Sequence, residues 1–448
     1  MPVPPRALFD WHARPGAFER LSPAWQGARV VSRTGGITNG SRVEVEVPQL
    51  GGLVHQRLLV EHRDYVEGER FTDVQLSGPF ARWAHTHSML PGPDGTSILE
   101  DRIDYALPLH PLGELVAGWF VTGELERLFD FRHARTRDDL LRHAQYADQP
   151  RRTVAITGGT GMIGRALTAL LTTGGHTVKW ITRRPDAARG DIGWDPDAGR
   201  LDPAALAGVD AVVHLAGANV GERWTDAHKR EIRQSREAGT RTLVQAMLMA
   251  SVAPECLISG SAVGYYGDGG AKVIDEEASK GAGFLADVCE VWEDEARKAE
   301  AAGVRVVIAR TGVVLSPAGG ALAKMLPAFR LGAGGPMGSG QQWMSWISLD
   351  DEVGALHALL MDRSCRGTFN LTGPTPVTNA EFGSTLGRVL HRPAFVPVPA
   401  FALTALFGEM AQSTVLDGQR VVPARLQATG YQFRHATLEA ALRFELGG

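Results

Sequence analysis

A glycine-rich turn between a short apolar strand and a helix constrains the fold of this chain more than any other feature. Residues 153–157 (TVAIT) have the pattern of a buried strand, and a helix is predicted to begin near residue 165 (RALTALL). Between them, Gly158, Gly161 and Gly164 would let backbone N–H groups approach a pyrophosphate, whose charge the helix N-terminus favours. A glycine pattern alone is weak evidence. The strand–turn–helix context favours a dinucleotide site over a tight turn without a ligand.

The segments that follow the turn alternate between strand and helix. Apolar β-branched runs occupy residues 177–182, 211–215, 255–259 and 304–309, and a helical pattern spans residues 225–249. This alternation predicts an α/β fold with a Rossmann-type doubly wound parallel sheet over residues 153–369. Residues 370–448 are punctuated by prolines and are expected to form a helix-rich module on the substrate side.

Residues 1–148 show a different pattern, with strand-like alternation and few helices. Strands are expected at residues 42–47, 56–61, 71–76, 83–89 and 97–107. A short helix at 15–21 and a long amphipathic one at 113–142 flank them. Each strand is expected to have one solvent-exposed face, which predicts an antiparallel sheet wrapped around the long helix. This arrangement is an α+β helix-grip domain.

Composition excludes several classes of function. The chain has 46 basic and 50 acidic residues and a formal charge of −4, so no nucleic-acid partner is expected. Its longest apolar runs, at residues 115–121 and 401–407, are short of the ~20 residues that span a membrane. No secretory signal is visible and the cysteines are few, which predicts a cytoplasmic protein. His85 and His87 share a strand face, but no third ligand follows at a useful spacing, so no metal is predicted.

The end of the second predicted strand bears on cofactor preference. Sites that prefer NAD usually place an acidic residue there to hold the ribose 2′-hydroxyl. This chain instead has Arg183 and Arg184, two guanidinium groups suited to a 2′-phosphate. NADP (NADPH) is therefore the predicted cofactor. The alternative is a pair of solvated arginines.

The second half of the chain resembles the extended short-chain dehydrogenase/reductase superfamily, and within it the epimerase family proteins of the YfcH type. The resemblance rests on AITGGTGMIG (155–164), HLAGANV (214–220), GERWTDAHKREIRQSR (221–236), SGSAVGYYG (259–267), FLADVCEVWEDEA (284–296) and GSGQQWMSWISLDD (338–351). The implied cofactor-binding residues are Gly158, Thr160, Gly161, Met162, Ile163, Gly164, Arg183, Arg184, Leu215, Ala216 and Gly217. The implied substrate-side residues are Asn219, Arg223, Trp224, Gln342 and Trp343.

Dehydrogenases of this superfamily use a Tyr-x-x-x-Lys pair, and this chain lacks one. None of its six tyrosines has a lysine four residues later. Ser261, Tyr266 and Tyr265 are the candidate catalytic residues, with Lys272 or Lys280 near enough to tune a phenol. The resemblance implies an NADP-binding oxidoreductase or nucleotide-sugar-epimerase-like enzyme with a small-molecule substrate and, by analogy, a homodimer. The alternative is a non-catalytic protein that responds to NADP.

The N-terminal part resembles the START-like, polyketide-cyclase-like helix-grip superfamily. The resemblance rests on FERLSPAWQ (18–26), LSGPFARWAHTHSM (76–89) and the predicted long helix. It implies an apolar ligand between the sheet and the helix. The alternative is a cup filled by its own side chains.

Overall fold

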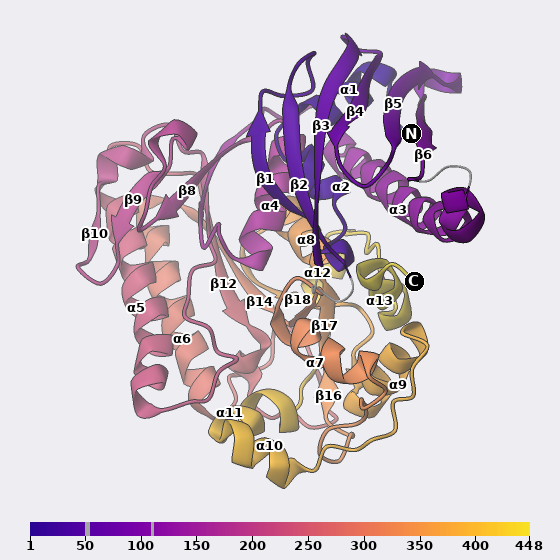
Figure 1. The fold of residues 1–448 in the computed structure, drawn as a ribbon. Helices are drawn as coiled ribbons and strands as arrows, with labels where there is room; N and C mark the ends of the chain where they lie inside the picture. The colour runs from indigo at the N-terminus through magenta and orange to yellow at the C-terminus, as the bar shows by residue number, and fades with distance from the viewer. Residues whose placement is uncertain (50–53, 109–111) are drawn as a thin grey trace. The chain divides into compact units, whose positions relative to one another are not determined.

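The computed structural model describes residues 1–49, 54–108 and 112–448, which divide into two compact units (Figure 1). The first unit contains Met1–Pro150, and the second contains most of the remaining chain. Each unit has a sheet and a hydrophobic core of its own. Within the described ranges, no helix combines the length and apolarity needed to cross a bilayer.

The described part of the N-terminal unit forms a six-stranded antiparallel sheet whose strands lie in chain order. The strands are β1 (Arg29–Thr34), β2 (Arg42–Gln49), β3 (Val54–Val66), β4 (Arg70–Ser77), β5 (Arg82–Pro91) and β6 (Ser97–Ala106). Strands β2 to β6 correspond to the five predicted ones. Strand β1 was not predicted, because it is an edge strand whose residues are almost all exposed and therefore show no alternation.

Helices α1 (Pro5–Ala13), α2 (Ala17–Leu21) and α3 (Leu112–Ala144) complete the N-terminal unit. Helix α1 begins with a proline at its first position and buries Leu8, Phe9 and Trp11. These side chains form a core with Phe71 and Met89 from the sheet. The long helix was predicted, whereas helix α1 was not.

The second unit, all of whose residues are described, contains an eight-stranded sheet in the order β10-β9-β8-β7-β11-β12-β14-β18. The strands, in chain order, are β7 (Thr153–Thr157), β8 (Thr177–Thr182), β9 (Ile192–Asp195), β10 (Arg200–Leu201), β11 (Ala211–His214), β12 (Cys256–Ala262), β14 (Arg305–Thr311) and β18 (Gly367–Leu371). All neighbours pair in parallel except β9 and β10. The predicted Rossmann-type parallel sheet is confirmed.

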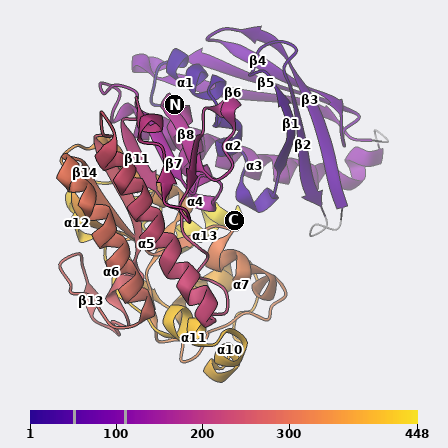
Figure 2. The same cartoon turned by 90° about the vertical axis from the view of Figure 1, so that its left-hand side faces the viewer.

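Helices cover the sheet of the second unit. They are α4 (Met162–Thr173), α5 (Asp226–Met249), α6 (Phe284–Arg297), α7 (Gly320–Arg330) and α8 (Leu349–Met361). Helices α5 and α6 lie side by side on one face of the sheet (Figure 2). Met247 of α5 packs in one core with Ala155, Val212 and Leu257 from the central strands.

The strand order places the candidate site. From β7 the chain first moves to β8 on one side and later crosses to β11 on the other. The carboxyl ends of β7 and β11 are therefore neighbours at the point where the strand order reverses, which is where open α/β sheets bind ligands. The glycine turn follows β7, and the HLAG segment follows β11.

Residues after 370 form short helices and two-residue strands, as predicted for the helix-rich module. The helices are α9 (Asn379–Val389), α10 (Ala400–Phe407), α11 (Glu409–Ala411), α12 (Ala424–Ala428) and α13 (Leu438–Leu446). Strand β20 (Arg420–Val421) pairs with β13 (Val273–Ile274), and β19 (Val377–Thr378) pairs with β16 (Trp343–Met344). These pairings bind the module to the segments that extend from the sheet.

Candidate cofactor and active site

The glycine turn has the close backbone packing expected of a dinucleotide site. Gly158 has φ +70°, and a Cβ there would lie 2.9 Å from the Leu215 carbonyl carbon. A Cβ at Gly164 would lie 2.3 Å from the Gly158 carbonyl oxygen, so glycine is required for α4 to approach the turn. Gly161 donates its N–H to the same oxygen at 2.9 Å and is exposed, as is Thr160. Backbone groups at the tip of the turn are thus accessible to an anion at the start of α4.

The hydroxyl of Thr157 connects the two loops of the site. It accepts hydrogen bonds from the N–H groups of Leu215 (3.0 Å) and Ala216 (3.1 Å) and lies 2.7 Å from His214 Nδ1. His214 is fully buried, and burial lowers its pKa to about 4. At neutral pH this ring is an uncharged hydrogen-bonding link that fixes the shape of the cofactor loops.

Arg236 on α5 places a positive charge behind the loop that follows β11. Its Nη1 donates to the carbonyls of Ala218 (3.2 Å) and Ile232 (3.1 Å), and its guanidinium lies over the Trp292 ring at 5.0 Å. A Cβ at Gly217 would lie 3.0 Å from the guanidinium carbon. Among the described residues no carboxylate pairs with Arg236, and burial lowers its pKa. A half-buried cation without an acidic partner favours an anionic ligand at this loop.

Arg183 and Arg184 are exposed immediately after β8. Neither forms an ion pair with any residue in the described ranges. The nearby Asp191 is bound to Arg189 at 2.5 Å and accepts the backbone N–H of Trp180 at 3.2 Å. Asp186, the other carboxylate of this segment, accepts the backbone N–H of Ala188 at 2.9 Å as a helix cap. Both carboxylates that follow β8 therefore have partners in the protein, whereas the two guanidinium groups are available.

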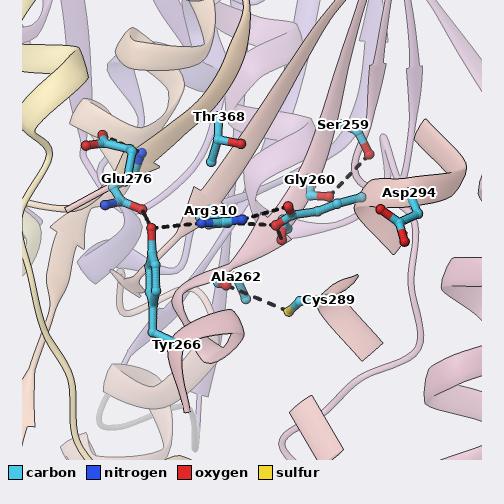
Figure 3. Close-up of polar contacts among 12 residues, drawn as sticks. Ser259, Gly260, Ala262, Tyr266, Glu276, Cys289, Asp294, Arg310 and Thr368 are labelled. Atoms are coloured by element: carbon cyan, nitrogen blue, oxygen red, sulfur yellow. Dashed lines mark hydrogen bonds and ion pairs between the residues drawn. The ribbon is translucent and has the colours of Figure 1, made fainter. Parts of the chain in front are cut away.

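Ser261 and Tyr266 lie in a buried polar network at the carboxyl ends of β12 and β14. Figure 3 shows Arg310 pointing to the Tyr266 hydroxyl within this network. Ser261 Oγ donates to Glu293 Oε1 at 2.7 Å, and both oxygens of Glu293 bind Arg310 at 2.7 and 2.8 Å. Arg310 Nη1 donates to the Tyr266 hydroxyl at 3.0 Å, and that hydroxyl donates to Asn370 Oδ1 at 2.8 Å. Each polar group here already has partners within the protein.

The hydroxyl groups of the two adjacent tyrosines differ in how available they are for proton transfer. Burial raises the pKa of Tyr266 despite the nearby Arg310, which is opposite to the change that activates a catalytic phenol. Tyr265 is half-buried, with the Arg310 guanidinium carbon 3.4 Å from its ring centroid. The Tyr265 hydroxyl forms no hydrogen bond with the described residues. The Lys280 ammonium binds Asp287 and Glu290 and forms no hydrogen bond with the hydroxyl of Tyr265 or Tyr266, and Lys272 is exposed.

The loop before α5 carries the first three predicted substrate residues. Trp224 is buried, donates from Nε1 to the Val220 carbonyl at 3.0 Å and packs edge-on against Phe284. Asn219 and Arg223 are exposed. Asn219 accepts a backbone N–H within its own loop, and Arg223 donates to a carbonyl of α10 at 3.3 Å. Trp224 thus stabilises the loop, and the two exposed side chains are the ones available to a ligand.

The other two predicted substrate residues lie beside the C-terminal module. The Gln342 side-chain amide donates to the carbonyls of Met337 (2.9 Å) and Val415 (3.0 Å). Trp343 is half-buried, with the Arg420 guanidinium stacked 4.2 Å from its ring centroid. Both side chains therefore help to hold the glycine-rich segment against this module.

Known protein families and relatives match the part of the chain that contains the glycine turn and the buried polar network. A family model described as the NAD dependent epimerase/dehydratase family matches residues 154–371, and a domain of unknown function (DUF1731) matches residues 398–445. The epimerase family protein MT2273 of Mycobacterium tuberculosis (strain CDC 1551 / Oshkosh) is 49% identical over 292 residues, covering 65% of this chain and 96% of that protein. The chain belongs to this epimerase family.

Two solved structures extend the comparison. The human epimerase family protein SDR39U1 (isoform 2), crystallised with NADPH, is 37% identical with a TM-score of 0.61, over 66% of this chain and 99% of that one. A nucleoside-diphosphate sugar epimerase from Corynebacterium glutamicum is 32% identical with a TM-score of 0.81, over 100% of this chain and 89% of that one. Membership of the epimerase family is confirmed. The START-like identity of the N-terminal unit stays a prediction.

Three residues of the buried network in the epimerase unit were not predicted from the sequence. Glu293, Arg310 and Asn370 come from α6, β14 and β18, and all are almost fully buried. A signal was present for Arg310, because a charged residue at the end of an otherwise apolar buried strand needs a partner. Nothing in the sequence indicated which residue that partner would be.

Proposed function

We propose that the epimerase unit binds NADP(H), with the pyrophosphate at the glycine turn and the 2′-phosphate at Arg183 and Arg184. The observation that carries this proposal is the pair of exposed guanidinium groups after β8, in a segment where Asp191 is paired with Arg189 and Asp186 caps a short helix. Arg236 adds positive charge behind the neighbouring loop. The NADPH in the crystal structure of the human relative is consistent with the same preference.

The test is a fluorescence titration of the full chain with NADPH and with NADH. The double variant Arg183→Ala/Arg184→Ala should bind NADPH roughly 10–100-fold more weakly, because hydrogen bonds to charged groups contribute about 1.5–3 kcal/mol. Its affinity for NADH should not change. Arg200→Ala, an exposed arginine paired with Asp195, is the matched control and should retain wild-type binding. Equal losses for the two dinucleotides would contradict the assignment of the 2′-phosphate.

We further propose that the bound nicotinamide exchanges hydride with a small-molecule substrate, in an oxidoreductase or nucleotide-sugar-epimerase-like reaction. The solved relative described as a nucleoside-diphosphate sugar epimerase supports nucleotide sugars as the first substrates to test. Tyr265 is the better-placed candidate acid/base, because its hydroxyl has no partner in the described protein, whereas that of Tyr266 has two.

Substitution of each tyrosine distinguishes their roles. The purified chain would be incubated with NADP(H) and nucleoside diphosphate sugars, while nicotinamide absorbance and sugar configuration are followed. Tyr265→Phe should lower turnover by about 10²–10⁴-fold, the usual contribution of a general acid or base, without changing NADPH affinity. Tyr266→Phe should mainly lower stability. If Tyr266→Phe alone abolishes turnover in a folded, NADPH-binding chain, Tyr266 is the catalytic group instead.

The second candidate is a non-catalytic protein that binds NADP(H) and changes its interactions in response. The absence of a Tyr-x-x-x-Lys pair and the engagement of Tyr266 within the protein favour it. Tight NADPH binding without turnover across nucleotide sugars and simple ketones would support this candidate over the enzyme.

For the N-terminal unit we propose a START-like domain that binds an apolar ligand. Two exposed aromatic side chains on α3, Trp119 and Phe120, support an apolar contact in this unit. A fluorescent fatty acid titrated into the full chain should bind, and Trp119→Ala should weaken that binding. Absence of binding to the wild type would remove this proposal and leave the cofactor assignment unaffected.

A further inference from the structure

Seven histidine and aspartate side chains gather in the N-terminal unit, far in sequence from the cofactor turn. The sheet contributes His62 from β3, Asp73 from β4, His85 and His87 from β5, and Asp101 from β6, while helices α1 and α3 add His12 and His133. All the histidines except His133 are buried. Buried charges need partners, so a cluster of this density requires a specific explanation.

The strand register brings the central members together. Strands β3 to β6 are neighbours in the sheet (Figure 1), and Asp73 stands opposite His85 across β4 and β5. His87 stands opposite Asp101 across β5 and β6, and His62 stands opposite Asp73 across β3 and β4. Residues that are directly opposite share a face of the sheet, as do residues two apart on one strand, so all five project from the same face.

Three ligand atoms converge at the centre of this cluster. Asp73 Oδ2 lies 3.5 Å from His87 Nε2 and 4.0 Å from His85 Nδ1. The ligand atoms of these three residues all lie within 4.8 Å of one another. Two ligand atoms bound to one ion at about 2.0–2.2 Å stand roughly 3.3–4.4 Å apart, from adjacent tetrahedral positions to trans positions of an octahedron. The two distances from Asp73 Oδ2 fall within that range.

The second ring nitrogens of His85 and His87 contact the Asp101 carboxylate, as outer nitrogens of ligating histidines do in metal sites. Asp101 Oδ1 lies 2.9 Å from His85 Nε2 and 2.7 Å from His87 Nδ1, which are the ring nitrogens that point away from the centre. His133 Nε2 approaches the other oxygen of Asp101 at 2.6 Å. A carboxylate that orients the second nitrogen of a ligating histidine is the usual outer partner in such sites.

His62 contacts the outer side of the Asp73 carboxylate. His62 Nδ1 and Asp73 Oδ1 are buried and lie 2.6 Å apart, and Oδ1 is the oxygen of Asp73 that does not approach His85 and His87. This contact holds the carboxylate so that its other oxygen, Oδ2, is the one that approaches the two imidazoles.

We propose that Asp73, His85 and His87 bind one divalent transition-metal ion. Asp101 orients both imidazoles, and His62 orients the Asp73 carboxylate. Two imidazoles and one carboxylate suit Zn²⁺ or Fe²⁺ and leave coordination positions open for water or a ligand. The prediction of no metal rested on the lack of a third ligand near His85 and His87 in the sequence. Asp73 supplies that ligand from the neighbouring strand.

The test uses the full chain without an affinity tag, stripped with a chelator and titrated with Zn²⁺, and with Co²⁺ as a spectroscopic probe. One ion per chain is expected, with a Co²⁺ spectrum typical of mixed nitrogen and oxygen ligands. Asp73→Asn and His85→Gln should each weaken binding by roughly 100-fold or more, since loss of even an outer partner usually costs 10–100-fold. His55→Asn is the matched control, because His55 is an exposed histidine on β3.

The competing occupant of this site is a proton. Burial alone would lower the pKa of His87, but Asp101 and Asp73 outweigh it and raise that pKa to about 9, so a protonated His87 could balance the two carboxylates. A wild-type chain that takes up no Zn²⁺ or Co²⁺ overturns the proposal, as does uptake that Asp73→Asn and His85→Gln leave unchanged. Circular dichroism and retained NADPH binding identify the variants that are folded.

Discussion

At Gly164 the approach of helix α4 to the preceding turn leaves no room for a side chain. The hypothetical Cβ lies 2.3 Å from a backbone oxygen, a clash that moving a flexible side chain cannot relieve. Gly164→Ala should therefore displace α4, lower stability by about 1–3 kcal/mol and weaken NADPH binding at least ~10-fold. Urea unfolding and fluorescence titration measure the two effects. Gly239→Ala on α5, whose Cβ would make an ordinary 3.7 Å contact with Trp194, should leave both unchanged or improve stability.

Glu352 on α8 makes stability depend on pH. It is fully buried, and burial raises its pKa from 4.5 to about 8, although Thr311 donates a hydrogen bond to it at 2.9 Å. The native state therefore binds an extra proton between these pH values. Its contribution to stability is complete below pH 4.5 and is lost as the pH rises through about 8.

Glu352→Gln should remove this dependence. Relative to wild type, the variant should gain roughly 1–4 kcal/mol of unfolding free energy between pH 5 and pH 9. Urea unfolding of both proteins at several pH values across this range measures the gain. A constant difference between the two proteins at every pH would show that Glu352 does not titrate in this way.

At the scale of elements, the Glu293–Arg310 pair joins helix α6 to the end of strand β14. Glu293 also accepts from Ser261 on β12, so a single carboxylate connects three elements next to the candidate active site. Both members of the pair are almost fully buried. The pair therefore fixes the position of the tyrosine segment, because Arg310 also holds Tyr265 and Tyr266.

Glu293→Gln should destabilise the second unit by about 3–5 kcal/mol, because it leaves the Arg310 charge buried without a counter-ion. Glu290→Gln on the same helix is the control. Glu290 pairs with Lys280 at a partly exposed site and should change stability by at most ~1 kcal/mol. Equal effects of the two substitutions in urea unfolding would mean that the buried pair has no special structural role.

The elements with strong hydrophobic periodicity were predicted from the sequence, and their ends were placed to within a few residues. The parallel strands of the second unit are short apolar runs between helical segments, and the glycine turn marks the first of them. Strands β9, β10 and β1 were missed, because they are short or exposed and show little hydrophobic periodicity.

At the scale of the whole molecule, each unit has its own sheet, core and candidate binding site. Hydrogen–deuterium exchange with and without NADPH should show slower exchange at residues 158–164 and 215–217. The six-stranded sheet should be unaffected. At 100 times its dissociation constant, NADPH should stabilise the second unit by about 2.7 kcal/mol. Protection confined to the N-terminal unit would contradict placement of the cofactor at the glycine turn.

The sequence alone determined the class of each unit and the position of the cofactor turn. Both depend on local information, since strand and helix periodicity and glycine spacing are set by backbone geometry over a few residues. The resemblance to the epimerase family also rested on short contiguous motifs, such as residues 155–164 and 259–267.

The tertiary structure decided what the polar residues do. Arg310 and Asn370 surround the Tyr266 hydroxyl, although they lie 44 and 104 residues away along the chain. Asp73 joins His85 and His87 only through the register of two antiparallel strands. The pairing of strands that are distant in the sequence decides which side chains share a face or a buried pocket. The residues of one strand do not indicate which strand will pair with it or in which register.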